Sequence, residues 1–145
     1  MAHRGAQARG IEAVPRGTRL TDVFVDSSAV IAIAFNELAA AGAQRKLRSA
    51  GRVQAAPLLE AEVRAACQHE GRPHDNQLLA AIEWIHPDRP LSAEIAIVLE
   101  AGYVRGADCW HLATALFAAP DPRNATFLTL DVRQRVVAKA LGFRV

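Results

Sequence analysis

Residues 23–28 read Val-Phe-Val-Asp-Ser-Ser, and this short stretch decides the fold class. The run 23–25 is continuously apolar and contains β-branched residues, which is typical of a strand buried on both faces of a sheet. Asp26 ends the run, and the two serines that follow can turn the chain and begin a helix. Because such a strand needs helices on both of its faces, the stretch predicts an α/β protein.

Working outward, a second apolar run at 126–130 reads Thr-Phe-Leu-Thr-Leu and ends at Asp131. Apolar residues at helical spacing predict helices over 29–35, 36–50, 57–70, 73–85, 92–103, 106–119 and 132–141, a weak strand at 53–56 and an edge strand at 143–145. The segment 86–90 is too rich in proline for a central strand. Strands that alternate with helices pair in parallel, so we expect a three-layer α/β/α sandwich with a mostly parallel central sheet.

The composition bounds the class of protein. The chain has 145 residues, which indicates one domain, and 51% hydrophobic against 22% charged residues, which excludes wholesale disorder. Two cysteines, Cys67 and Cys109, form no disulfide framework, and they favour a reducing compartment. The longest uncharged stretches are near half the length of a membrane span. We therefore expect a cytoplasmic protein with no membrane association.

Charge divides the chain at residue 21. Residues 1–21 hold four arginines against one glutamate, a balance of +3, and carry no apolar periodicity. The remaining residues hold 13 basic and 14 acidic side chains, a balance of −1. We interpret 1–21 as a flexible basic extension and 22–145 as the folded domain.

Four acidic residues are candidates for a shared site. Asp26 and Asp131 end the two strands, and ligands of open parallel sheets bind at the carboxyl ends of the strands. Asp108 opens the most apolar helix, and Glu60 lies in the first turn of its own. Each alone can be a helix cap or a complement to the helix dipole. If they converge, two carboxylates about 5 Å apart repel by roughly 3 kcal/mol at an effective dielectric of 20, so they require a cation or raised pKa values.

Four motifs surround these acids: Val25-Asp26-Ser27-Ser28-Ala29, Leu59-Glu60-Ala61-Glu62-Val63, Ala107-Asp108-Cys109-Trp110-His111-Leu112-Ala113-Thr114-Ala115 and Phe127-Leu128-Thr129-Leu130-Asp131. In this order and spacing they resemble a PIN domain, with the greatest likeness to the VapC-type toxins of bacterial toxin–antitoxin pairs. The resemblance covers residues 22–145 and implies a PIN-like nuclease domain there.

The resemblance implies an endoribonuclease that hydrolyses RNA phosphodiester bonds with Mg²⁺ or Mn²⁺. It also implies a homodimer and a cognate antitoxin. The matching catalytic and metal-binding positions are Asp26, Glu60, Asp108 and Asp131. Ser28 and Thr129 are expected to hydrogen-bond these carboxylates. Three arginines, Arg64, Arg133 and Arg135, are candidates for contacts with RNA.

Two features depart from the family pattern. The chain carries about 20 residues before the first strand, and Cys109-Trp110 replaces smaller residues. We interpret Trp110 as a core residue and His111 as a hydrogen-bonded core histidine, although a pair formed by Asp108 and His111 could bind zinc. Glu37 is either a peripheral site residue or a solvated helix start.

Three other functions remain open. A haloacid-dehalogenase-like phosphatase, or another Mg²⁺-dependent phosphoryl hydrolase, shares the acid at the end of the first strand, but the former needs a second aspartate where Ser28 stands. A receiver domain needs an acidic pair on the first loop and a lysine after the last strand, and neither is evident. A non-catalytic PIN-fold interaction module is the third alternative. Motifs of nucleotide triphosphatases, serine hydrolases, dinucleotide-binding proteins and zincins are absent.

Overall fold

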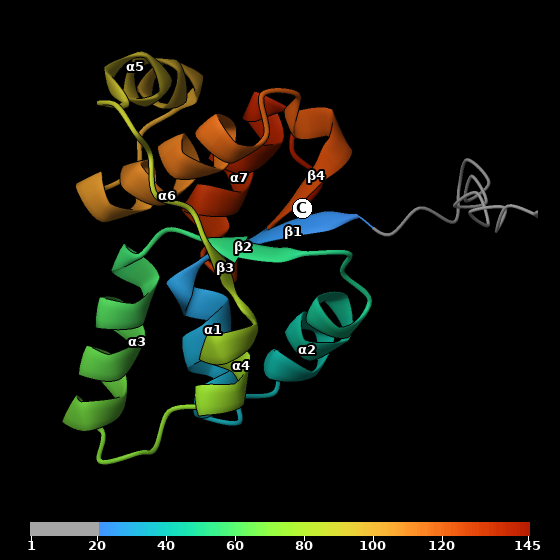
Figure 1. Cartoon of the computed structure of the whole chain (residues 1–145), viewed down its shortest axis with the longest axis vertical. Coiled ribbons are helices and arrows are strands. Elements are labelled where there is room, and N and C mark those ends of the chain that lie inside the picture. Colours follow the sequence, from blue (N-terminus) through green and yellow to red (C-terminus); the bar gives the residue numbers. More distant parts are fainter. Residues whose placement is uncertain (1–20) are drawn as a thin grey trace, which may run out of the picture.

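The computed structural model describes residues 21–145, and a four-stranded parallel sheet lies at its centre (Figure 1). The strand order is β3-β2-β1-β4. Its strands are β1 (Asp22–Val25), β2 (Val53–Ala55), β3 (Glu83–Trp84) and β4 (Ala125–Leu128). Because every pair is parallel, the predicted α/β class with a parallel sheet is confirmed.

Two groups of helices cover the sheet, one on each face (Figure 1). The helices are α1 (Ser27–Ala34), α2 (Ala40–Arg48), α3 (Leu58–His69), α4 (Asn76–Ala81), α5 (Ser92–Ala101), α6 (Gly106–Ala118) and α7 (Val132–Leu141). In Figure 1 the first four lie below the sheet and the last three above it. A short 3₁₀ turn, η1 (Pro122–Asn124), precedes β4.

Alternation along β1 divides the core into two clusters. Phe24 stacks on Phe127 with ring centroids 5.7 Å apart and packs with the cluster of α5, α6 and α7. Val23 and Val25 point to the opposite face, where they pack with residues of α1, α2 and α3 such as Leu59. This arrangement explains the continuous apolar run at 23–25, because both faces of the strand are buried.

The register of the two central strands fixes which residues share an edge of the sheet. Val25 pairs with Leu128, and the N–H of Asp26 donates to the carbonyl of Leu128 at 2.9 Å. The segment just after β1 therefore lies beside the segment just after β4. Asp26 begins α1 and Asp131 begins α7, so the start of each helix is held at this carboxyl edge.

The structure differs from the expected elements in the middle of the chain. Glu83–Trp84 is a strand that pairs with β2, although we expected a helix over 73–85. The helix α4 ends at Ala81, and the prediction was wrong because Ile82 and Ile85 have the three-residue spacing of apolar positions on a helix. The segment 36–50 is helical only from Ala40, because Asn36 takes a left-handed φ of 51°. The expected edge strand at 143–145 forms a single bridge, between Arg144 and Thr126.

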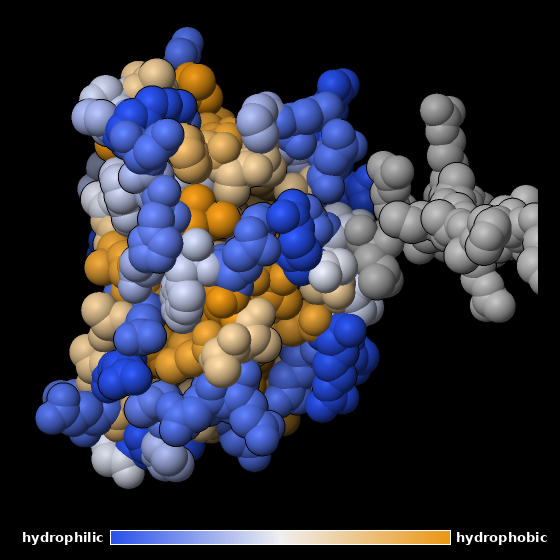
Figure 2. All heavy atoms as spheres, viewed as in Figure 1, coloured by the Kyte–Doolittle hydropathy of each residue, from blue (hydrophilic) through white to orange (hydrophobic). Residues whose placement is uncertain are grey.

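The predicted extension, 1–21, lies outside the described residues apart from Thr21. Within the described part of the chain, the helices are all too short or too polar to cross a membrane. On the face seen in Figure 2, apolar residues show between hydrophilic ones across the middle of the molecule.

Candidate active site

Asp26 is the centre of the group of polar residues at the carboxyl edge of the sheet. It is only 2% exposed, and its Oδ2 accepts the N–H of Ser28 at 3.1 Å, which caps α1. Asp131 caps α7 in the same way, through the N–H of Gln134 at 2.8 Å. Both aspartates thus have a structural role as caps, at the edge of the sheet where ligands of parallel sheets bind.

Gln134 connects three parts of this edge from a fully buried position. Its Nε2 lies 3.4 Å from Oδ1 of Asp26 and 3.4 Å from the carbonyl oxygen of Asp108. Its Oε1 accepts the hydroxyl of Thr129 at 2.7 Å. The amide therefore holds the end of β1, the start of α6 and the end of β4 at fixed separations.

The side chains of Thr129 and Ser28 complete the network. Oγ1 of Thr129 lies 3.3 Å from Oδ2 of Asp26 as well as 2.7 Å from Gln134, and its single hydrogen can serve only one of them at a time. Ser28 reaches Asp26 through its main-chain N–H, while its hydroxyl lies 3.1 Å from Oγ1 of Thr129 and accepts the N–H of Leu130 at 2.9 Å.

Asp108 lies in the first turn of α6 and is half-buried. Burial raises its pKa, and the negative charges of Asp26 and Asp131 raise it further, with a smaller contribution from Glu62. The positive charge of His111 opposes this rise. Three carboxylates from other parts of the chain are therefore close enough to Asp108 to affect its protonation.

His111 lies among these acids rather than in a purely apolar core. Its ring is fully buried, Nε2 hydrogen-bonds Oε1 of Glu62, and the same nitrogen lies 3.7 Å from Oδ1 of Asp26. Burial lowers the pKa of His111, but the bond to Glu62 and the charges of Asp26 and Asp108 outweigh it and raise that pKa above its ordinary value. The interpretation of His111 as a hydrogen-bonded core histidine is confirmed.

Glu60, the glutamate that the sequence pointed to, faces elsewhere. Its carboxylate pairs with Arg64 at 3.5 Å, and the side chain is 45% exposed. None of its ion pairs or hydrogen bonds within the described residues reaches Asp26, Asp108 or Asp131. Residues two positions apart on a helix point about 200° apart, so when Glu62 faces the site Glu60 must face away.

Two residues of the site were missed in the sequence, and each left a signal. Glu62 lies three positions after Leu59 and one before Val63, both fully buried, so it is an acid on the inner face of α3. Gln134 lies three positions after Asp131, the spacing of a capping box in which the N-cap carboxylate accepts the N–H of the third helical residue.

The remaining candidates have other surroundings. Arg135 donates from Nη2 to the carbonyl of Thr129 at 3.0 Å, and the guanidinium of Arg133 lies over the ring of Tyr103, 5.8 Å from its centroid. Trp110 packs partly buried against the core, as predicted. Glu37 is exposed in the loop before α2.

The donors of this edge fit a hard divalent cation by their chemistry. They are carboxylate oxygens, which Mg²⁺ and Mn²⁺ prefer. Burial first, and then the charges of Asp26 and Asp131, raise the pKa of Asp108, and a bound cation would oppose the effect of those charges. In the described structure, no three His, Cys, Asp or Glu side chains are arranged so as to hold a metal ion together. The imidazole of His111 lies between Glu62 and Asp26, and their contacts raise its pKa, which favours its protonated form.

Comparison with known families gives one match. The model of the family described as PIN domain matches residues 23–140, which include all of these acids. No curated protein and no solved structure matches the chain significantly. PIN domains are generally metal-dependent nucleases that act on nucleic acids.

Proposed function

Because this chain belongs to the PIN domain family, we propose that it is a divalent-metal-dependent endoribonuclease and the toxin of a type II toxin–antitoxin pair. The observation that carries the proposal is the convergence of Asp26, Asp108, Asp131 and Glu62 from distant parts of the sequence around Gln134 and His111. Purely structural caps need no such concentration of charge, because each cap is satisfied by its own helix.

We assign the metal to Asp26 and Asp108, with Asp131 completing the site and Glu62 taking the role expected of Glu60. Glu62 replaces Glu60 in this role because the two side chains point in different directions. Glu62 hydrogen-bonds His111, whereas Glu60 pairs with Arg64 on the outer face of α3. When bound there, Mg²⁺ or Mn²⁺ supplies a lowered pKa for water and stabilises charge on a phosphoryl oxygen.

The protein's own contribution is orientation. Both oxygens of the Asp26 carboxylate have a donor, because Gln134 Nε2 lies 3.4 Å from Oδ1 and the N–H of Ser28 donates to Oδ2 at 3.1 Å. Ser28 fixes Thr129 in turn, so the rotamer of Asp26 is determined before any substrate arrives. Such partners typically change metal affinity or activity by about 10–100-fold when removed.

Arginines near the edge are proposed to contact the RNA backbone. Arg133 and Arg135 follow Asp131 on α7 and are exposed. Arg64 is exposed as well, and its ion pair with Glu60 is of the surface kind that contributes little and exchanges readily with a phosphate. Because the folded part of the chain has no net positive charge, RNA binding would depend on these local cations and would weaken with salt.

The proposed partners are a second copy of the chain and an antitoxin protein. The exposed apolar side chains Leu99, Tyr103, Val132 and Val136 lie on or beside α5 and α7, and they offer a protein partner apolar surface to bury. The two cysteines are unpaired and buried, which agrees with the reducing cytoplasm as the proposed location.

The test of this proposal is incubation of the purified chain with bacterial RNA and, in parallel, with single-stranded DNA of matched length. We expect RNA cleavage with Mg²⁺ or Mn²⁺, none with EDTA, and restoration when the metal is returned. Absence of cleavage with every divalent metal would favour the non-catalytic interaction module. Induced expression in a bacterial host should stop growth, and co-expression of the neighbouring antitoxin should restore it.

A further inference from the structure

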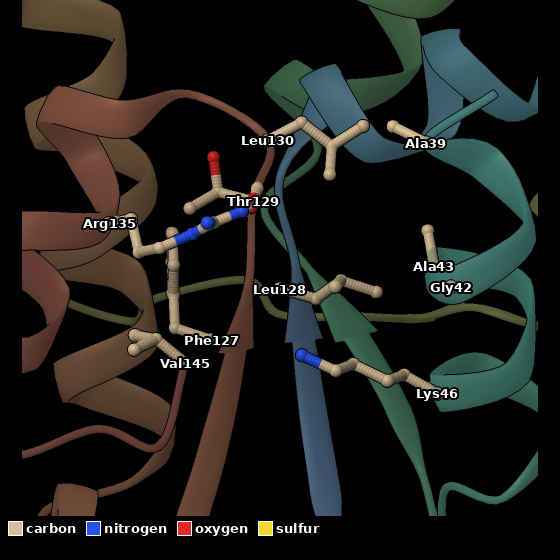
Figure 3. A pocket seen from close by; sticks show the side chains of 10 residues that line it. All are labelled: Ala39, Gly42, Ala43, Lys46, Phe127, Leu128, Thr129, Leu130, Arg135 and Val145. Atoms are coloured by element: carbon tan, nitrogen blue, oxygen red, sulfur yellow. Dashed lines mark hydrogen bonds between the residues drawn. The ribbon is translucent and has the colours of Figure 1, made fainter. Parts of the chain in front are cut away.

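A second polar feature lies on the other side of the strand β4 from the acids. Here α2, the end of β4 and α7 enclose a pocket of about 190 Å³ (Figure 3). Leu128, Leu130 and Ala43 form an apolar floor, while Lys46 and Arg135 enter from opposite sides. The pocket is therefore apolar at its base and positive at its rim.

Neither cation is neutralised by an ion pair with another of the described residues. No acidic side chain lines the pocket. Within residues 21–145, the ion pairs of the protein include neither Lys46 nor Arg135. Two cations that face one space without an acidic side chain between them repel each other, and an anion bound there would reduce that repulsion.

Thr129 connects this pocket to the acidic edge. Its carbonyl oxygen accepts Nη2 of Arg135 at 3.0 Å, and its hydroxyl lies 3.3 Å from Oδ2 of Asp26. One residue thus fixes the direction of the guanidinium in the pocket and touches the central carboxylate of the candidate site. The remaining guanidinium donors of Arg135 stay free for another acceptor.

We propose that this pocket binds a backbone phosphate of the RNA strand, next to the phosphate that is cut. The inference rests on the proposed ribonuclease function and names where its substrate is held. Arg135 supplies a planar fork of donors that matches two phosphate oxygens, Lys46 supplies a compact charge, and the apolar floor lies against the ribose. An acidic segment of a partner protein is the competing occupant.

The test uses the full chain carrying Asp26→Asn, so that binding is measured without cleavage. The probe is a short single-stranded RNA, titrated over a range of salt concentrations. Lys46→Gln and Arg135→Gln should each weaken binding and make the salt dependence of log K shallower by about 0.7, the value for one phosphate contact with a single strand. The control is Arg48→Gln, which removes a cation of the same helix that lies outside the pocket, and it should leave the slope unchanged.

Unchanged slopes in both pocket variants, or no RNA binding at all, would overturn the proposal. Binding of polyglutamate, but not of RNA, in this pocket would also overturn the proposal, in favour of an acidic protein segment. The side chain of Lys46 makes no hydrogen bond or ion pair with the described residues, and Ser49 reaches only its main-chain carbonyl, so the Lys46→Gln variant tests the pocket without removing a contact of the fold. Failure of the ribonuclease function appears separately, as absence of cleavage by the wild-type chain.

Discussion

Nε2 of His111 hydrogen-bonds Oε1 of Glu62, which joins α6 to α3 at the carboxyl edge of the sheet although the two residues are 49 positions apart. The same nitrogen lies 3.7 Å from Asp26, so one imidazole is placed between two carboxylates. This relationship supports the proposed assignment of Glu62 to the site, and the predictions below test the group of acids around it.

The two glutamates of α3 form a matched pair for the first prediction. Glu62→Gln should lower RNA cleavage by more than about 100-fold, beyond the range typical of residues that only orient a ligand. Glu60→Gln should stay close to wild type, because it loses only an exposed ion pair with Arg64. The measurement is the initial rate with Mn²⁺, with circular dichroism to check the fold. If the two variants exchanged these outcomes, the assignment of Glu62 would be wrong.

Thr129 provides a test of the orienting network. Thr129→Val keeps the shape of the side chain but removes the acceptor of the Asp131 N–H and the donor to Gln134. Unpaired buried groups then cost about 1–3 kcal/mol of stability, and cleavage should fall about 10–100-fold. Thr126→Val is the control, since Thr126 lies on the same strand. Urea unfolding and cleavage rates measure the two effects, and a Thr129→Val protein as active as the Thr126→Val control would contradict the role given to the network.

His111 and Asp108 predict how the stability of the metal-free protein varies with pH. The folded state raises the pKa of His111, so the stability that its positive charge contributes is complete below about pH 6.5 and is lost as pH rises through the raised value. Asp108 acts in the same direction, because its raised pKa means that the folded state loses stability as pH rises from about 3.8.

Urea unfolding in EDTA at a series of pH values measures this effect. Wild type should lose stability from about pH 6.5 upward, and His111→Gln should remove most of that slope. His69→Gln, at the exposed end of α3, is the control and should behave like wild type. A wild-type stability that rises over this pH range would show that His111 carries no charge in the folded protein.

Much of the fold could be predicted from local patterns, but the limits of that prediction have physical reasons. The apolar run at 23–25 identifies a doubly buried strand because no other common element buries both sides of so short a segment. The two-residue strand β3 could not be predicted, because Ile82 and Ile85 are spaced as in a helix and the strand exists only through its pairing with β2.

The candidate site could likewise be predicted only in part. The sequence points to Asp26 and Asp131 because they follow strands, and to Asp108 because it lies at the start of a helix. Glu60 and Glu62 belong to the same motif and differ only in the helix face on which they lie. The buried residues Leu59 and Val63 show which face is the inner one, and Glu62 lies on it. Gln134 depends on contacts with Asp26, 108 positions away, and with Asp108, 26 positions away, so its pattern in the sequence indicates a cap and nothing further.

The most direct measurement of the central claim is metal-dependent RNA cleavage by wild type and Asp26→Asn, purified side by side. Wild type should cut RNA with Mn²⁺ and stop in EDTA. Asp26→Asn should lose cleavage by more than about 100-fold while it keeps its circular dichroism spectrum and its affinity for RNA. Glu100→Gln, which alters an exposed acid of α5, should cut as wild type does. Equal cleavage by Asp26→Asn and wild type, or cleavage that persists in EDTA, would contradict a metal site built on these carboxylates.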